Sequence, residues 1–166
     1  MKDKIWIKYY KQGVFKSEFT FVQAEQQISI QVKVLKSLGI KSGDRVIVKY
    51  ENSPELIFIY FALYKIKAVV IPVHYKEDKD RLMFILKDSN AVGVLSLEGF
   101  ERSKKLKGGS DYKIPKGVCT IIYTSGTTAA PKGVCLTMKN WHTNAKCLIK
   151  HHNLNSKTIF ASPLLL

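Results

Sequence analysis

The chain has 166 residues, 46% of them hydrophobic and 24% charged, and its 27 basic and 13 acidic residues give a net charge of +14. This composition is typical of a soluble globular chain with a single domain. It argues against a transmembrane segment, because the longest apolar run, Leu56 to Tyr64, is far shorter than a bilayer span. The first ten residues also lack the apolar core of a secretory signal.

The first predicted helix covers residues 20 to 38. Its apolar residues recur at helical spacing, as Ile28, Val32 and Leu35 show. Gly39 is a natural residue to end this helix, because glycine accepts the left-handed conformation of a C-terminal cap. A turn over residues 41 to 44 then leads into a predicted strand from Arg45 to Tyr50.

The second predicted helix covers about residues 54 to 66. Ser53 serves as its N-cap, and Pro54 lies in the first turn, where a missing N–H has no consequence. The helix is apolar nearly all round, so we expect it to be deeply buried. Ala68 to Val73 follows as a strand whose continuous apolar run indicates cover on both faces.

An amphipathic helix from Asp78 to Asp88 and a strand from Ala91 to Leu97 come next. Helices and strands therefore alternate along the chain. Such alternation predicts an α/β fold with a parallel sheet and right-handed crossover helices. We expect residues 45–50, 68–73 and 91–97 to be neighbouring parallel strands, with ligands bound beyond their carboxyl ends.

Residues 98–117 carry a charge run, Gly108-Gly109-Ser110 and Pro115, and we interpret them as a linker. The predicted organisation is an N-terminal α/β subdomain over residues 1–97, this linker, and a strand–loop–strand–helix segment over residues 118–166. Because the chain stops within the apolar run Pro163 to Leu166, we expect that last segment to be truncated.

Residues 123 to 134 read Tyr-Thr-Ser-Gly-Thr-Thr-Ala-Ala-Pro-Lys-Gly-Val and directly follow an apolar strand. Gly126 allows backbone conformations in which successive N–H groups point into one concavity and bind an anion. The hydroxyls of Ser125, Thr127 and Thr128 add neutral donors, and Lys132 adds a charged one. The stretch favours phosphate binding, yet it is not the common P-loop, because Pro131 precedes Lys132 and Gly133 follows it.

The stretch resembles the phosphate loop of the adenylate-forming enzymes, which include acyl-CoA synthetases, adenylation domains of peptide synthetases and luciferases. Every position that can be compared matches that family's Tyr-Thr-Ser-Gly-Thr-Thr-Gly-x-Pro-Lys-Gly-Val except Ala129, where the family has glycine. Residues 39–46, 52–55 and 81–89 also resemble family motifs. The opening residues 5–14 are similar to the start of bacterial long-chain fatty-acid CoA ligases, which makes a fatty acid the first substrate to consider.

The resemblance implies the incomplete N-terminal part of the adenylate-forming fold. It also implies a ligase that converts ATP and a carboxylate, here an acyl group, into an acyl-adenylate and pyrophosphate. Coenzyme A would accept the acyl group only with the part of the enzyme that lies beyond residue 166. The implied phosphate-binding residues are Thr124, Ser125, Gly126, Thr127, Thr128, Lys132 and Gly133. Lys132 is the implied catalytic residue, and Thr124 either contacts Mg²⁺ or is a strand-end hydroxyl bonded to backbone.

Three hypotheses about function follow. The chain is an N-terminal fragment of such a ligase, active with the remainder of a split or truncated enzyme; or it is a catalytically dead remnant; or it is a basic phosphate- or nucleic-acid-binding module. Ala129, Lys67 and Met138 depart from the family pattern, where glycine, glycine and histidine are usual. With these departures and the short linker, we expect the isolated chain to be inactive.

The positive charge comes mostly from lysines scattered along the chain, which indicates solvated side chains rather than a specific nucleic-acid site. The three cysteines, Cys119, Cys135 and Cys147, lack metal-ligand spacing. We expect Cys119 and Cys135 to be buried thiols in strands. Free thiols fit a reducing compartment, so we predict a cytoplasmic protein.

Overall fold

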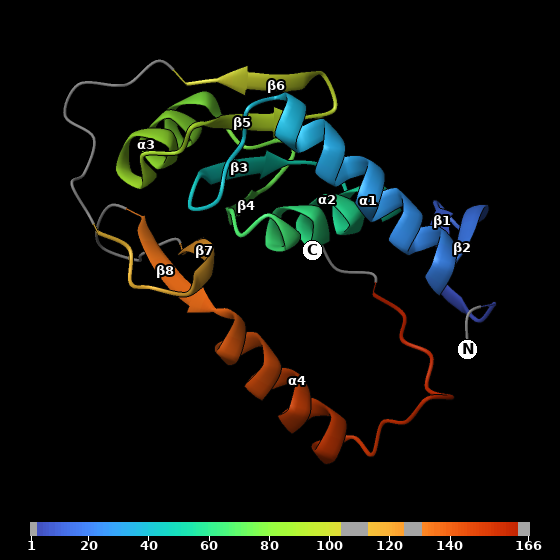
Figure 1. The fold of residues 1–166 in the computed structure, drawn as a ribbon. Coiled ribbons are helices and arrows are strands. Elements are labelled where there is room, and N and C mark those ends of the chain that lie inside the picture. Colours follow the sequence, from blue (N-terminus) through green and yellow to red (C-terminus); the bar gives the residue numbers. More distant parts are fainter. Residues whose placement is uncertain (1–2, 104–112, 125–130, 163–166) are drawn as a thin grey trace.

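The computed structural model describes residues 3–103, 113–124 and 131–162, which form a three-layered α/β arrangement with a separate hairpin at one end (Figure 1). In chain order the elements are β1 (Ile5–Lys11), β2 (Val14–Thr20), α1 (Phe21–Ser37), β3 (Arg45–Lys49), α2 (Pro54–Lys65), β4 (Val69–Val73), α3 (Lys79–Ser89), β5 (Gly93–Ser96), β6 (Gly99–Arg102), β7 (Val118–Thr124), β8 (Lys132–Thr137) and α4 (Met138–His151).

The main sheet has the strand order β6-β5-β3-β4-β7-β8. Strands β5, β3, β4 and β7 run parallel, whereas the edge strands β6 and β8 are antiparallel to their neighbours. The predicted strands 45–50, 68–73 and 91–97 are therefore confirmed as parallel neighbours. The sheet also includes β7 and β8, which follow the expected linker in the sequence. The strands before and after that segment therefore belong to one sheet.

Two hydrophobic cores lie on opposite faces of the sheet. Val46 and Val48 of β3 pack with α1 and α2 on one face, whereas Ile47 packs with Ile85 of α3 on the other. All three β3 residues are fully buried. Because successive residues of a strand point to opposite faces, a strand covered on both sides needs an apolar residue at each position. This explains the continuous apolar runs of the sequence.

The helices begin and end close to the predicted residues. Ser53 caps α2 by accepting a hydrogen bond from the Leu56 N–H, and Pro54 is buried in the first turn. Burial of α2 is incomplete, because Phe61 remains 43% exposed. Its ring packs edge-on against Trp6 of β1, with centroids 5.6 Å apart. The expectation that this helix is deeply buried therefore holds for one side of it only.

Two features differ from the sequence interpretation. Strands β1 and β2 form a hairpin with a turn at Gln12 and Gly13, and both turn residues have positive φ angles. The segment expected to be a linker begins with strand β6, which pairs with β5. A side chain at Gly93 of β5 would meet the Glu101 carbonyl oxygen at 2.4 Å, so glycine allows this close pairing. The linker interpretation is wrong for these first residues, and the division into subdomains stays a prediction.

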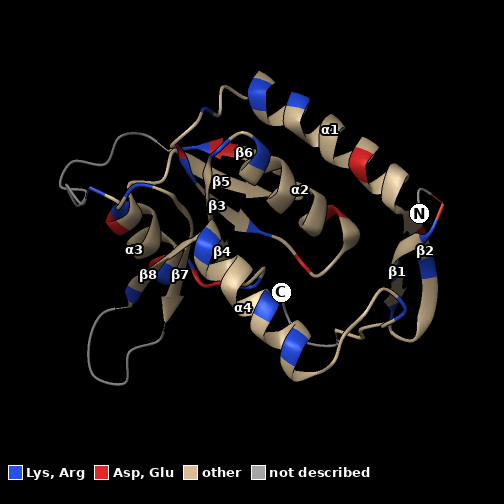
Figure 2. Ribbon diagram, turned by 60° about the horizontal axis from the view of Figure 1, so that its bottom comes forward, with Lys and Arg blue, Asp and Glu red and all other residues tan. Residues whose placement is uncertain are grey.

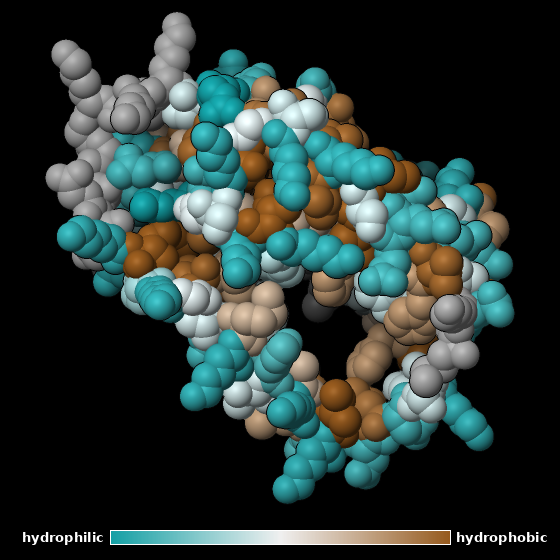
Figure 3. Space-filling model, viewed as in Figure 1, coloured by the Kyte–Doolittle hydropathy of each residue, from teal (hydrophilic) through white to brown (hydrophobic). Residues whose placement is uncertain are grey.

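Helix α4 projects from the rest of the molecule and has no buried residue. The segment after it returns toward the first hairpin, where the Lys4 ammonium donates to the Ser156 carbonyl oxygen. Figure 3 shows an opening between this segment, α4 and the body of the protein. Apolar side chains around this part of the chain stay exposed, among them Ile159 at 94% and Phe160 at 71%. None of the helices in the described ranges is long and apolar enough to cross a membrane.

Candidate functional site

The end of strand β7 and the start of strand β8 form the described part of the candidate site. Thr124 is the last residue of β7, and it lies directly opposite Lys132, the first residue of β8. The Thr124 hydroxyl donates to the Lys132 carbonyl oxygen over 3.5 Å, which is long for such a bond. Both residues are exposed, and no ion pair among the described residues involves Lys132. One cation is therefore available to an anion at the carboxyl end of β7, next to a hydroxyl whose present hydrogen bond is long.

Four of the predicted phosphate-binding residues, Ser125, Gly126, Thr127 and Thr128, lie outside the described residues, as does Ala129. The structure brings together the other three, Thr124, Lys132 and Gly133. Whether any of them binds phosphate stays a prediction.

Tyr123 connects the candidate site to helix α3. Its hydroxyl donates to Oδ2 of Asp88 at 2.6 Å, a short bond to a carboxylate. Both side chains are half-buried. Burial raises the pKa of Tyr123, and the hydrogen bond and the negative charge of Asp88 raise this pKa further. The tyrosine thus stays protonated and can donate throughout the physiological range.

Gly133 is the direct cross-strand partner of Tyr123. A Cβ atom at Gly133 would lie 2.9 Å from Cγ2 of Ile121 and 3.2 Å from Cζ of Tyr123. These distances are shorter than normal van der Waals contacts, and Ile121 is buried. Glycine at this position therefore leaves room for the Tyr123 ring, which is a steric reason for the glycine besides any contact with a ligand.

A buried hydroxyl in the middle of β7 joins three elements. Thr120 is 2% exposed, and its Oγ1 lies 3.0 Å from the Tyr64 hydroxyl of α2. The indole N–H of Trp141 in α4 donates to the same oxygen at 3.1 Å. These bonds connect α2 and α4 to the strand that leads into the candidate site.

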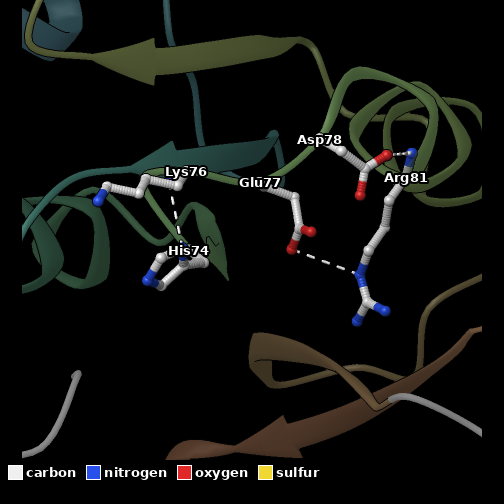
Figure 4. A network of polar contacts seen from close by, with 5 residues as sticks. All are labelled: His74, Lys76, Glu77, Asp78 and Arg81. Atoms are coloured by element: carbon white, nitrogen blue, oxygen red, sulfur yellow. Dashed lines mark hydrogen bonds and ion pairs between the residues drawn. The ribbon is translucent and has the colours of Figure 1, made fainter.

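The loop after β4 begins at the same edge of the sheet as the end of β7, since the two strands are parallel neighbours. Its polar contacts are local (Figure 4): Nδ1 of His74 accepts from the Lys76 N–H at 3.2 Å, and Asp78 caps helix α3 by accepting from the Arg81 N–H. Nε of Arg81 also lies 3.3 Å from Oε2 of Glu77. His74 was not among the residues predicted from the sequence, although its position directly after a buried strand is a signal for a residue at the ligand-binding edge of a sheet.

Among the described residues, positive charge is spread over several elements. Figure 2 shows lysines and arginines on α1, on α4 and on several strands. One prediction about the cysteines is wrong: Cys119 is buried, but Cys135 is exposed. Cys135 lies on β8, which is an edge strand of the sheet, and the described part of the chain does not cover its side chain.

Residues 2–113 and 97–165 match the family described as AMP-binding enzyme. The chain is 28% identical over 155 residues to one of the plipastatin synthase proteins of Bacillus subtilis, covering 83% of this chain and 6% of that protein. It is 26% identical over 162 residues to crotonobetaine/carnitine–CoA ligase of Escherichia coli, covering 75% and 31%. The chain therefore spans less than a third of the length of these relatives.

Two solved structures resemble the structure of this chain. The o-succinylbenzoate CoA synthetase of Bacillus subtilis, in complex with its acyl-adenylate intermediate, superposes with a TM-score of 0.76 at 18% identity, covering 90% of this chain and 44% of that one. This likeness concerns the fold. The N-terminal subdomain of Klebsiella oxytoca NpsA, in complex with 3-hydroxyanthranilyl-AMSN, has a TM-score of 0.59 at 27% identity and covers 74% and 34%.

Proposed function

The chain belongs to the AMP-binding enzyme family, and we propose that it is the phosphate-binding part of an ATP-dependent, carboxylate-adenylating ligase. The observation that carries this proposal is the pairing of Thr124 with Lys132 at the carboxyl end of β7. That edge is where open α/β sheets bind their ligands. The family resemblance of residues 123–134 supports the same position for ATP.

In this proposal Lys132 neutralises charge on the β- and γ-phosphates, and the Thr124 hydroxyl contacts Mg²⁺. Both side chains are exposed, and the bond from the Thr124 hydroxyl to the Lys132 carbonyl is long, so this oxygen can exchange it for a ligand. Ser125, Gly126, Thr127, Thr128 and Gly133 add donors by resemblance to the family. Bound Mg²⁺ supplies neutralisation of the phosphate charge.

The proposed reaction begins with attack of a carboxylate on the α-phosphate of ATP. Carboxylates are weak nucleophiles, so such catalysis depends on positioning and on charge neutralisation. Lys132 contributes here by holding the pyrophosphate group while the bond to it breaks. The relatives are named for different products and substrates, so they do not specify the acyl group. We keep a fatty acid as the first candidate and assign no described residue to coenzyme A.

We further propose that residues 1–166 alone bind the phosphates but do not complete the reaction, and that the reaction takes place in the cytoplasm and needs the remainder of the fold that the relatives have. The motivation is that the chain covers 31% of a ligase relative. Purified protein is expected to show no carboxylate-dependent exchange of pyrophosphate into ATP. Exchange above the blank would show that the chain is catalytically complete and would reject this part of the proposal.

Binding of Mg²⁺-pyrophosphate, measured by titration calorimetry at low salt, tests the phosphate site. We expect Lys132→Ala to weaken binding about tenfold, as the loss of one charge-assisted contact does. Lys16→Ala is the matched control, because Lys16 is an exposed strand lysine on the first hairpin, and we expect it to change affinity little. Equal losses would mean diffuse attraction to a +14 surface. In that case the basic-module hypothesis predicts binding of single-stranded nucleic acid with a steep dependence on salt.

A further inference from the structure

We infer that Asp88 is a positioning residue for the proposed phosphate site and that it acts through Tyr123 on Thr124 and Lys132. This inference rests on the proposed function and goes beyond it, because Asp88 lies on α3, outside the stretch 123–134. The observation that carries it is the 2.6 Å hydrogen bond from the Tyr123 hydroxyl to Asp88 Oδ2.

The contacts form a continuous path from Asp88 to the two strand ends. Tyr123 directly precedes Thr124 in β7, and Gly133 directly follows Lys132 in β8. Tyr123 and Gly133 face each other across the strands, and the Tyr123 ring occupies the space that a side chain at Gly133 would fill. The Asp88 carboxylate holds the Tyr123 ring in place, and it therefore also restrains the cross-strand pair Tyr123–Gly133, which adjoins Thr124 and Lys132.

Because of the position of Asp88, its hydrogen bond with Tyr123 does more than satisfy a half-buried hydroxyl: it connects β7 to helix α3. Asp88 is the penultimate residue of α3, and α3 packs on the sheet through Ile85. The carboxylate is thus held by a packed element rather than by a loop. Strand β8 is an edge strand, and β7 is its only partner among the described strands. The bond to α3 therefore restrains the end of a hairpin that the sheet supports from one side.

Tyr50 provides a matched control within the same sheet. It is also half-buried, and its hydroxyl donates to the Ser96 carbonyl oxygen at 2.8 Å, joining the ends of β3 and β5. Tyr50→Phe and Tyr123→Phe remove the same atom from comparable surroundings. If the bond between Tyr123 and Asp88 had a purely structural role, both substitutions would lower stability, and neither would change the affinity for an anion.

The experiment is a double-mutant cycle on Tyr123→Phe and Asp88→Ala, with affinity for Mg²⁺-pyrophosphate measured by calorimetry and stability measured separately in urea. We expect each variant to weaken binding about three- to tenfold, which corresponds to the net free energy of a typical intramolecular hydrogen bond. The double variant should be no weaker than either single variant, because both remove one bond. Asp88→Asn keeps an acceptor oxygen and should restore most of the affinity, and Tyr50→Phe should not change it.

Labelling tyrosine at Cζ allows the Tyr123 resonance to be followed during titration with base. We expect the pKa of Tyr123 to fall in Asp88→Ala, because the carboxylate no longer raises it. Additive losses in the cycle, or an equal loss of affinity in Tyr50→Phe, would overturn the inference. If Lys132→Ala weakens binding while Asp88→Ala and Tyr123→Phe do not, the inference fails and the proposed function stands. If Lys132→Ala has no effect, the proposed function itself fails.

Discussion

Gly39 and Lys67 occupy the same position in two helix ends of the same type. After α1, the Ile40 N–H donates to the Leu35 carbonyl oxygen, and after α2 the Ala68 N–H donates to that of Leu63. In each helix end, the residue between the C-cap and the donating residue has a positive φ angle, which is 74° at Gly39 and 60° at Lys67. This is the Schellman arrangement, in which glycine is the favoured residue. Lys67 therefore adopts a backbone conformation that favours glycine, and α2 ends there in the same way as α1 ends at Gly39.

Lys67→Gly is expected to stabilise the protein by about 1 kcal/mol, because glycine adopts this backbone without the steric cost that a side chain carries. Gly39→Ala is the reverse change at the equivalent position and should destabilise by a similar amount. Its Cβ would also lie 3.0 Å from the Arg102 guanidinium. Urea unfolding monitored by circular dichroism measures both. A Lys67→Gly variant less stable than the original protein would contradict the expectation.

Thr120→Val should loosen the attachment of α4. The substitution keeps the shape of a side chain that is 2% exposed but removes the oxygen that accepts from Trp141 and lies 3.0 Å from the Tyr64 hydroxyl. Leaving these polar groups without their partner costs about 1–3 kcal/mol. In a Trp6→Phe background, the fluorescence of Trp141 alone reports the change, and we expect its emission to shift to longer wavelength. Unchanged emission and stability would show that Thr120 does not hold α4.

The sequence predicted the central strands because local and global signals agree in that region. Strands covered on both faces need apolar residues throughout, and Ser53 with Pro54 marks a helix start without ambiguity. The first hairpin was missed although Gln12-Gly13 between aromatic residues is a usable turn signal. Strand β6 was missed for a physical reason. It has four residues, one of them half-buried, so its pairing with β5 leaves little pattern in the sequence.

The contacts around the candidate site were less predictable than its position. The motif over residues 123–134 indicated the site, but the partner of Tyr123 is 35 residues away in the chain. Tyr64 and Trp141, which contact the Thr120 hydroxyl, are 56 and 21 residues away. Such pairs depend on how helices pack on the sheet, which periodicity does not specify. The exposure of Cys135 depends likewise on which face of an edge strand is covered.

Stability should fall as the pH rises above about 10, the ordinary pKa of tyrosine. Burial raises the pKa of Tyr50, Tyr60, Tyr64 and Tyr123. In this range the unfolded tyrosines have released their protons while the folded ones still hold them, so the unfolded state binds fewer protons. The free energy of unfolding therefore decreases with pH, by at most about 1.4 kcal/mol per tyrosine and pH unit. Below that range this contribution is fully present.

Urea midpoints at about pH 8 and about pH 11, on either side of the ordinary tyrosine pKa, measure the effect. Tyr60→Phe and Tyr123→Phe should each make the decrease between the two conditions smaller. A decrease of the same size in both variants as in the original protein would show that other groups cause it.

Gly133→Ala distinguishes the steric reason for this glycine from a contact with phosphate. The added Cβ would lie 2.9 Å from Cγ2 of Ile121, which is 4% exposed and has little room to move. We expect a loss of about 1–3 kcal/mol of stability, as overpacking usually costs. Cys135→Ala is the control on the same strand, because Cys135 is exposed and should change stability by less than about 0.5 kcal/mol.

The affinity for Mg²⁺-pyrophosphate completes this test, because alanine keeps the backbone N–H of residue 133. If that N–H were the only reason for the glycine, Gly133→Ala would bind like the original protein and be equally stable. Displacement of the Tyr123 ring instead predicts that stability and affinity fall together, and that the Tyr123 resonance shifts, since the ring can no longer hold its hydroxyl 2.6 Å from Asp88. A stable Gly133→Ala variant with an unchanged Tyr123 resonance would show that the ring and the added methyl group coexist, which would remove Gly133 from the path between Asp88 and Lys132.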